Sequence, residues 1–97
     1  MYKHKVFTLE EIYDEYKYGN YKDDCERICH DVAVYIVNIY GLSFRHASMV
    51  ANEAYKEKKN DVKEFLSSID IGAKIAIKIR DDIEYRIIEQ LKTTFAM

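Results

Sequence analysis

The segment SIDIGAKIAIKIR, residues 68–80, fits two incompatible structures, and the choice between them sets the fold class. Apolar and polar residues alternate along it, as they do in a half-buried β-strand. Apolar residues also recur at every fourth position from Ile71 to Phe95, as they do in a long helix. We favour the helix, because no turn signal follows Arg80 and a lone strand would have no partner. The segment therefore predicts one long C-terminal helix.

The rest of the chain is poor in residues that interrupt helices. Its 97 residues include no proline and three glycines, each beside a plausible break between helices. Proline lacks a backbone donor and fixes φ, and glycine frees the backbone, so their scarcity favours helix throughout. This length suits one domain with one core. We predict a single all-α domain over residues 1–97, a compact bundle of four or five helices.

Capping patterns predict where these helices begin and end. The predicted starts are Thr8, with Glu11 as its capping-box partner, then Tyr21 or Asp23, Ser43, and Asn60 or Asp61. The predicted ends are Gly19-Asn20, Gly41, Lys58 and, for a short fourth helix, Ser67-Ser68.

The second predicted helix carries an apolar run, residues 32–37, that has no polar side. A helix that is wet on one side would not tolerate such a run, so other helices or a second subunit must cover it. Together with the C-terminal isoleucines, the run predicts a homodimer. The residues expected at the dimer interface are Val34, Val37, Ile77, Ile83 and Ile87.

Charge is distributed unevenly along the chain. The net charge is −2, which argues against nucleic acid or a membrane surface as the main partner. Between residues 8 and 31, however, eight acids stand against three bases. Solvated helix surface is the simpler explanation, and the alternative is a face that imitates phosphate spacing and occupies a basic groove on another protein. The acidic face would comprise Glu10, Glu11, Asp14, Glu15, Asp23 and Asp24.

The sequence also bears on location. No apolar run approaches the roughly 20 residues that span a bilayer, and the first residues lack the apolar segment of a signal peptide. We therefore expect a cytoplasmic protein with reduced thiols and no membrane partner.

No residue cluster matches a specific catalytic or metal-binding pattern. Cys25 and Cys29 lack the second ligand pair that a zinc motif needs, and they lie on an apolar stripe, so we expect buried, inert thiols. His30 and Asp31 are adjacent, and adjacent helical residues point about 100° apart. Ser43 can meet residue 46 as a helix cap meets its first turn. We expect no enzyme, no metal and no cofactor, and we keep a metal-dependent protein built on Cys25, Cys29 and His30 as a third hypothesis.

The segment Tyr40-Gly41-Leu42-Ser43 also resembles the turn of a helix-turn-helix. In that alternative, a small DNA-binding transcriptional regulator, Val37, Leu42, Ala47 and Val50 would hold the two helices together. The residues facing DNA would be Arg45, His46, Ser48, Met49 and Asn52, with Lys56, Lys58 and Lys59 near phosphates. The acidic composition counts against this alternative, since phosphate attraction supplies most non-specific affinity.

At the same Tyr40-Gly41-Leu42-Ser43 segment, then at Ala47 and at Glu53-Ala54-Tyr55, the chain resembles small uncharacterised helical proteins of bacteriophages that infect low-GC Gram-positive hosts. The resemblance does not extend into residues 56–60. It implies no reaction. It implies a protein that binds a host enzyme, a defence nuclease or a polymerase. The leading hypothesis is therefore a non-enzymatic protein-binding domain, an inhibitor of a host defence or nucleic-acid-processing protein.

Overall fold

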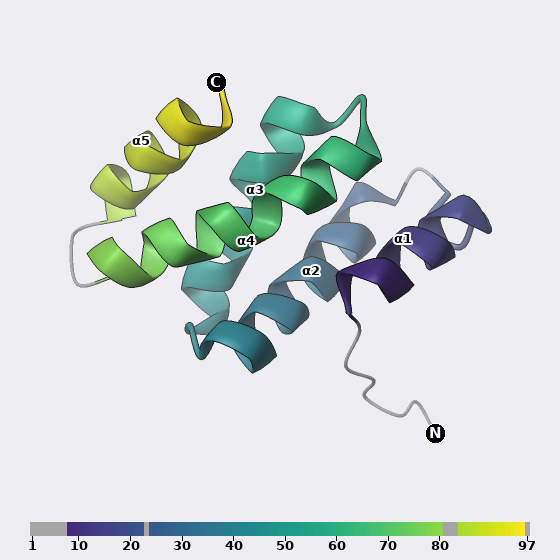
Figure 1. Cartoon of the computed structure of the whole chain (residues 1–97), viewed down its shortest axis with the longest axis horizontal. Coiled ribbons are helices and arrows are strands. Elements are labelled where there is room, and N and C mark those ends of the chain that lie inside the picture. The colour runs from purple at the N-terminus through teal and green to yellow at the C-terminus, as the bar shows by residue number, and fades with distance from the viewer. Residues whose placement is uncertain (1–7, 23, 81–83, 97) are drawn as a thin grey trace.

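The computed structural model of the chain describes residues 8–22, 24–80 and 84–96, and these form helices joined by short connections (Figure 1). The helices are α1 (Leu9–Lys17), α2 (Cys25–Tyr40), α3 (Phe44–Lys58), α4 (Val62–Ile79) and α5 (Glu84–Phe95). No strand occurs within the described residues. The prediction of an all-α fold is confirmed, and the strand alternative for residues 68–80 is wrong.

The predicted caps at the starts of α1, α3 and α4 are present, whereas α2 begins at Cys25 with Asp24 as its cap, later than the predicted start at Tyr21 or Asp23. Thr8 Oγ1 accepts a hydrogen bond from the backbone N–H of Glu11 at 3.1 Å, and the Thr8 N–H donates to Glu11 Oε1 at 3.0 Å. Ser43 caps α3 and Asp61 caps α4, each through the N–H three residues further on. Gly41 ends α2 with φ of 71°, in the left-handed region. These boundaries depend on contacts three or four residues apart, so the sequence shows them.

The C-terminal third differs from the prediction. Ser67 and Ser68 do not end a helix, because their hydroxyls donate to the carbonyls of Lys63 and Phe65 at 2.8 Å and leave the backbone ladder intact. α4 therefore runs through to Ile79, and a separate helix of 12 residues, α5, follows. The single long C-terminal helix is not formed.

The break has a physical reason. Apolar residues at spacing four drift about 40° per step around a helix of 3.6 residues per turn. A continuous rod would carry the end of the series away from the core. With the break, Ile87, Leu91 and Phe95 return onto the bundle, where each is at most 3% exposed.

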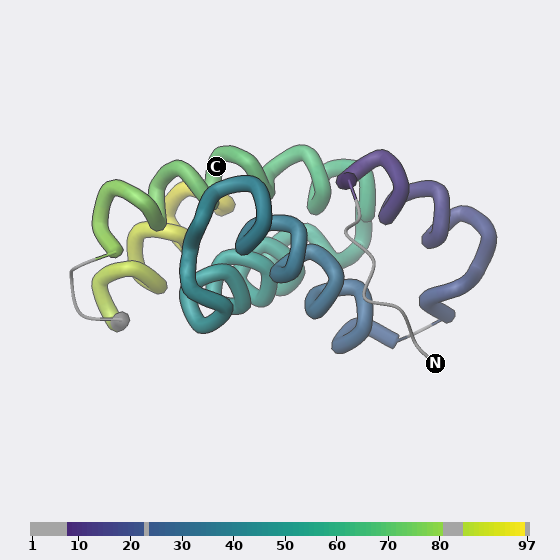
Figure 2. Tube along the Cα trace, turned by 90° about the horizontal axis from the view of Figure 1, so that it is seen from below, coloured from purple at the N-terminus to yellow at the C-terminus, as the bar shows by residue number. Residues whose placement is uncertain are grey.

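α3 lies at the centre of the molecule and contacts α2, α4 and α5, whereas α1 packs on α2 and α4. Figures 1 and 2 place α1 and α5 at opposite ends of the bundle. Three alanines on α3 let its neighbours approach closely, and each is fully buried: Ala47, Ala51 and Ala54. The largest fully buried side chains are Phe65, Ile12, Ile36, Ile69, Ile87, Leu91, Val32 and Val50.

α4 approaches its neighbours closely at Gly72. A Cβ atom added there would stand 2.5 Å from Phe95 Cζ on α5 and 2.9 Å from Val50 Cγ1 on α3. Glycine is required at this position by space, not by its backbone angles. Gly72 therefore marks the point where α3, α4 and α5 meet.

The residues predicted for a dimer interface are placed mostly inside one chain. Ile87 is fully buried and Val34 is 8% exposed, so neither is available to a second copy. Val37 and Ile77 are half-buried and pack against the core. Ile83 lies outside the described residues. The apolar excess that suggested a homodimer is thus largely covered by the chain's own helices.

Candidate functional site

The predicted acidic face divides into acids with local roles and acids without them. Glu11 closes the capping box of α1, Glu15 accepts a hydrogen bond from Asn20 Nδ2, and Asp24 caps α2 by accepting from the N–H of Arg27 at 3.0 Å. Asp23 lies outside the described residues. Fewer carboxylates are therefore available to a partner than the six predicted for the acidic face.

Glu10 and Asp14 are the acids that remain on the outer side of α1. They lie four residues apart, and therefore on the same side of the helix. Both are exposed, and Asp14 forms an ion pair with Lys17 at 3.6 Å. Both side chains of that pair are more than half exposed, so the pair contributes little stability and leaves the carboxylate accessible.

Beside Glu10, a groove of about 230 Å³ separates α1 from α4. Its apolar lining comes from Leu9 and Tyr13 of α1 and from Leu66 of α4. Its polar lining comes from Glu10, Lys63, Ser67 and Asp70. This groove could not be predicted from the sequence. The acids of α1 are close in sequence to those before α2 and were therefore assigned to one face with them, whereas the structure also packs α1 against α4.

Asp70, which lines the groove, is held in place by two tyrosines of α2. The hydroxyls of Tyr35 and Tyr40 both donate to Asp70 Oδ1, at 3.0 Å and 2.6 Å. Burial raises the pKa of both phenols, and the hydrogen bonds to the carboxylate raise these pKa values further. The two phenols stay protonated near neutral pH and fix the carboxylate in position.

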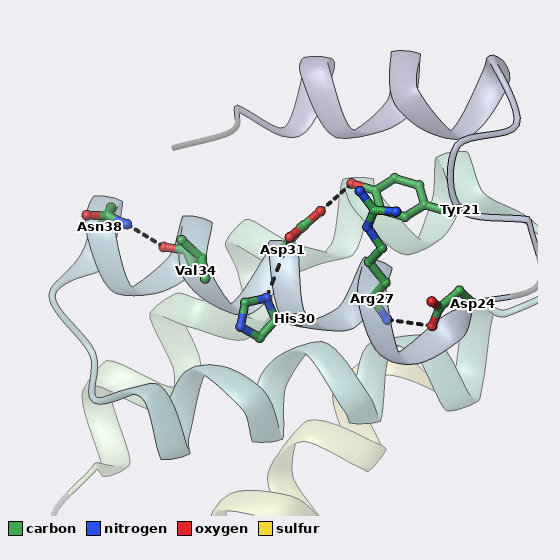
Figure 3. Close-up of polar contacts among 7 residues, drawn as sticks. All are labelled: Tyr21, Asp24, Arg27, His30, Asp31, Val34 and Asn38. Atoms are coloured by element: carbon green, nitrogen blue, oxygen red, sulfur yellow. Dashed lines mark hydrogen bonds and ion pairs between the residues drawn. The ribbon is translucent and has the colours of Figure 1, made fainter. Parts of the chain in front are cut away.

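A second polar cluster joins the start of α2 to the connection before it (Figure 3). The Tyr21 hydroxyl donates to Asp31 Oδ2 at 2.7 Å, and Arg27 lies over the Tyr21 ring at 5.9 Å. Burial is the main reason that the pKa of Tyr21 is raised, and the hydrogen bond to Asp31 adds to it. His30 Nδ1 is 3.6 Å from Asp31 Oδ1, too far for a hydrogen bond. This cluster anchors Tyr21 and does not form an oriented acid–base pair.

The two cysteines have different surroundings. Cys29 is buried, with its Sγ 4.0 Å from the carbonyl oxygen of Ala51, and burial raises the pKa of its thiol to about 12. Cys25 is exposed, because it is the first residue of α2 and lies at the edge of the packed region. The expectation of a buried thiol is therefore wrong for Cys25. Within the part of the chain that the structure describes, no three His, Cys, Asp or Glu side chains are grouped closely enough to hold a metal ion.

The helix-turn-helix residues are partly where that alternative requires them. Leu42, Ala47 and Val50 are buried, and Val37 packs on the core, so they join α2 to α3. The residues meant to face DNA are all exposed or half-exposed, although Met49 also packs against the core. Arg45, Asn52 and Lys56 are exposed, His46 and Ser48 are half-exposed, and Lys56 forms an ion pair with Glu53 at 3.5 Å.

One buried charge was not anticipated. Glu53 of α3 is 5% exposed, and its Oε2 atom has no hydrogen-bond partner among the described residues. A lone glutamate within an alternating helix face gives no sequence signal of burial, because only the packing of neighbouring helices covers it.

The comparisons with known proteins identify no relative of this chain. No family model, no curated protein and no solved structure matches the chain. None of the helices in the described ranges combines the length and the apolar character needed to cross a bilayer. The function must therefore be inferred from the surfaces themselves.

Proposed function

We propose that this chain is a non-enzymatic protein-binding domain, and that the groove between α1 and α4 receives a basic, partly apolar segment of a partner protein. The observation that carries the proposal is an apolar lining flanked by carboxylates. Leu9, Tyr13 and Leu66 offer anchor contacts, and Glu10 and Asp70 offer acceptors beside them. A helix or peptide that lies in such a groove binds through apolar anchors and is oriented by charges at the rim.

Charge favours a basic partner. Glu10 lines the groove and Asp14 follows one turn further along the same side of α1. Lys63 is the cationic side chain of the groove lining. The resemblance to bacteriophage proteins suggests that the partner is a host defence or nucleic-acid-processing protein, since such proteins carry basic surfaces for nucleic acid. The chain would then act as a stoichiometric inhibitor.

The test is capture from a lysate of a low-GC Gram-positive bacterium with three versions of the chain as bait. The double variant Glu10→Lys, Asp14→Lys reverses the accessible charge of α1 without touching a helix cap. Glu57→Lys makes the same kind of change on an exposed site of α3 that does not line the groove. We expect one protein at fixed stoichiometry with the wild type and with Glu57→Lys, and its loss with the double variant.

Salt provides a second criterion. Capture that depends on charge should weaken as the ionic strength rises, because exposed pairs are screened. Equal capture by all three baits, or capture of no protein at fixed stoichiometry, would refute the proposal.

A DNA-binding regulator is the second candidate, and one observation favours it. Arg45, Asn52 and Lys56 are all exposed, and their spacing of seven and four residues places them along one stripe of α3. Such a regulator would bind duplex DNA with steep salt dependence, and Arg45→Ala would weaken binding. Absence of binding to duplex DNA at low salt would eliminate this candidate.

A further inference from the structure

A pocket of about 180 Å³ lies where the end of α1, the start of α2, the end of α3 and the start of α4 come together. Its volume is close to the roughly 150 Å³ of an engineered cavity that accepts benzene, so one small group fits. Besides two aliphatic side chains, its walls consist of Tyr16, Tyr21, Tyr55, Asp24, Cys25 and Lys59. The groove between α1 and α4, by comparison, has one aromatic ring in its lining, that of Tyr13.

Two of the three tyrosine rings are fixed before any ligand arrives. Tyr21 is 5% exposed, and its hydroxyl is held by Asp31 at 2.7 Å. Tyr55 meets Phe65 edge to face, with ring centroids 5.4 Å apart. Tyr16 is 44% exposed and forms an outer wall. Rings that are already ordered lose little conformational entropy on binding, which favours affinity for a small ligand.

The chemistry of the pocket suits a cation that carries methyl groups. Aromatic faces attract cations, and rings grouped around a cavity are the usual receptors for quaternary ammonium groups. The Arg27 guanidinium lies over the Tyr21 ring at 5.9 Å, so one face of this ring is already occupied by a cation of the chain itself (Figure 3). The Asp24 carboxylate adds a negative charge to the wall, and the opposing ammonium of Lys59 is on an exposed, flexible side chain.

We propose that this tyrosine-lined pocket binds a methylated ammonium group, as found in choline or in trimethyllysine. This site is separate from the groove between α1 and α4, so either can fail without the other. A methylated ammonium is weakly hydrated and presents apolar surface to the rings, whereas a bare ammonium would keep its water.

The first experiment titrates the chain with choline and, in parallel, with 3,3-dimethyl-1-butanol, a neutral molecule of the same shape. Amide chemical shifts follow occupancy. We expect saturable binding of choline, and binding of the neutral molecule weaker by about 3- to 30-fold, the range of cation–π interactions. A peptide with trimethyllysine is the third probe, and a preference for it or for choline supports the site and identifies the source of the group.

Variants assign the binding to the pocket. Tyr16→Leu should weaken choline binding at least about 3-fold, whereas Tyr16→Phe keeps the ring and should leave it unchanged. Asp24→Asn preserves the cap of α2 and should weaken binding, and Lys59→Gln should strengthen it. These sites are at the surface, so folding is checked simply by circular dichroism.

The native cysteines give an independent readout. Cys25 lines the pocket and is exposed, whereas Cys29 is buried, so alkylation of the folded chain should report on Cys25. Choline should slow this alkylation more than the neutral molecule does at the same concentration. Equal affinity for choline and its neutral analogue, unchanged binding by Tyr16→Leu, or no binding of any probe would overturn the proposal.

Discussion

Gly72→Ala tests whether α5 packs where the structure places it. In an exposed helix interior, alanine is more stable than glycine by about 1 kcal/mol. At Gly72 the new Cβ would stand 2.5 Å from Phe95 Cζ and 2.9 Å from Val50 Cγ1, and both of these side chains are buried, at most 3% exposed. Steric overlap therefore opposes the gain in helix propensity.

The expected magnitude follows from these two effects. Overpacking a core costs about 1–3 kcal/mol, against the gain of about 1 kcal/mol from alanine. The free energy of unfolding should fall by up to about 2 kcal/mol, and each lost kcal/mol should lower the melting temperature by roughly 4–8 °C. Phe95→Leu makes room for the new methyl group. The double variant should therefore lose less than the sum of the single variants, with a coupling of about 0.5–3 kcal/mol.

The assay is urea unfolding followed by circular dichroism, with the dependence on urea compared between variants to confirm a common unfolding transition. Lys74, exposed on the same helix, gives the matched control: the difference between Lys74→Gly and Lys74→Ala measures helix propensity without a tertiary contact. If Gly72→Ala stabilises the chain as much as this control, or if the double variant is additive, then α5 does not pack against Gly72 and the placement of α5 is wrong.

Three further outcomes are expected. Glu53→Met should raise the free energy of unfolding in urea by about 1–3 kcal/mol, because it removes a buried carboxylate whose Oε2 atom lacks a hydrogen-bond partner. A loss of stability would contradict this and would show that the ion pair of Glu53 Oε1 with Lys56, at 3.5 Å, outweighs the cost of burying Oε2. Iodoacetamide near neutral pH should modify Cys25 and spare Cys29, because Cys29 is buried and its pKa is raised to about 12. Peptide mass spectrometry measures both sites, and equal modification of Cys29 would contradict this prediction. Above pH 10.0 the free energy of unfolding should fall, because tyrosines of the unfolded chain release their protons there, whereas Tyr35 and Tyr40 of the folded chain keep theirs. Phenolate absorbance from Tyr35 and Tyr40 that appears before the helical signal is lost would contradict this.

The sequence was informative where structure depends on near neighbours. The capping pairs Thr8 with Glu11, and Ser43 with residue 46, each lie within four residues of sequence, so a short segment is enough to show them. The left-handed end of α2 at Gly41 is visible for the same reason. The starts of α1, α3 and α4 and the all-α class could therefore be predicted, whereas the starts of α2 and α5 were not.

The sequence was misleading where packing decides. Spacing four from Ile71 to Phe95 predicts a rod, and nothing local forbids one. The rod is broken because burying its last apolar residues on α3 needs a change of direction, and the position of α3 cannot be known from that segment. In the same way, Ser67 and Ser68 look like the end of a helix until their hydroxyls are seen bonded within it.

The candidate sites were largely beyond the reach of sequence spacing. Asp70 receives its two hydroxyls from residues 35 and 30 positions away. The tyrosine-lined pocket draws its walls from four helices and two connections. The acids of α1 and those before α2 were grouped because they are neighbours in sequence, although three of the five described ones serve caps and turns.

The central position of α3 has a consequence for how the chain opens. Three helices rest on α3, so its amides are shielded by every part of the bundle except α1. α1 and α5, at the two ends, can each separate while α3 keeps its remaining neighbours. Deuterium should enter the terminal helices first and α3 last, at the rate set by opening of the whole molecule.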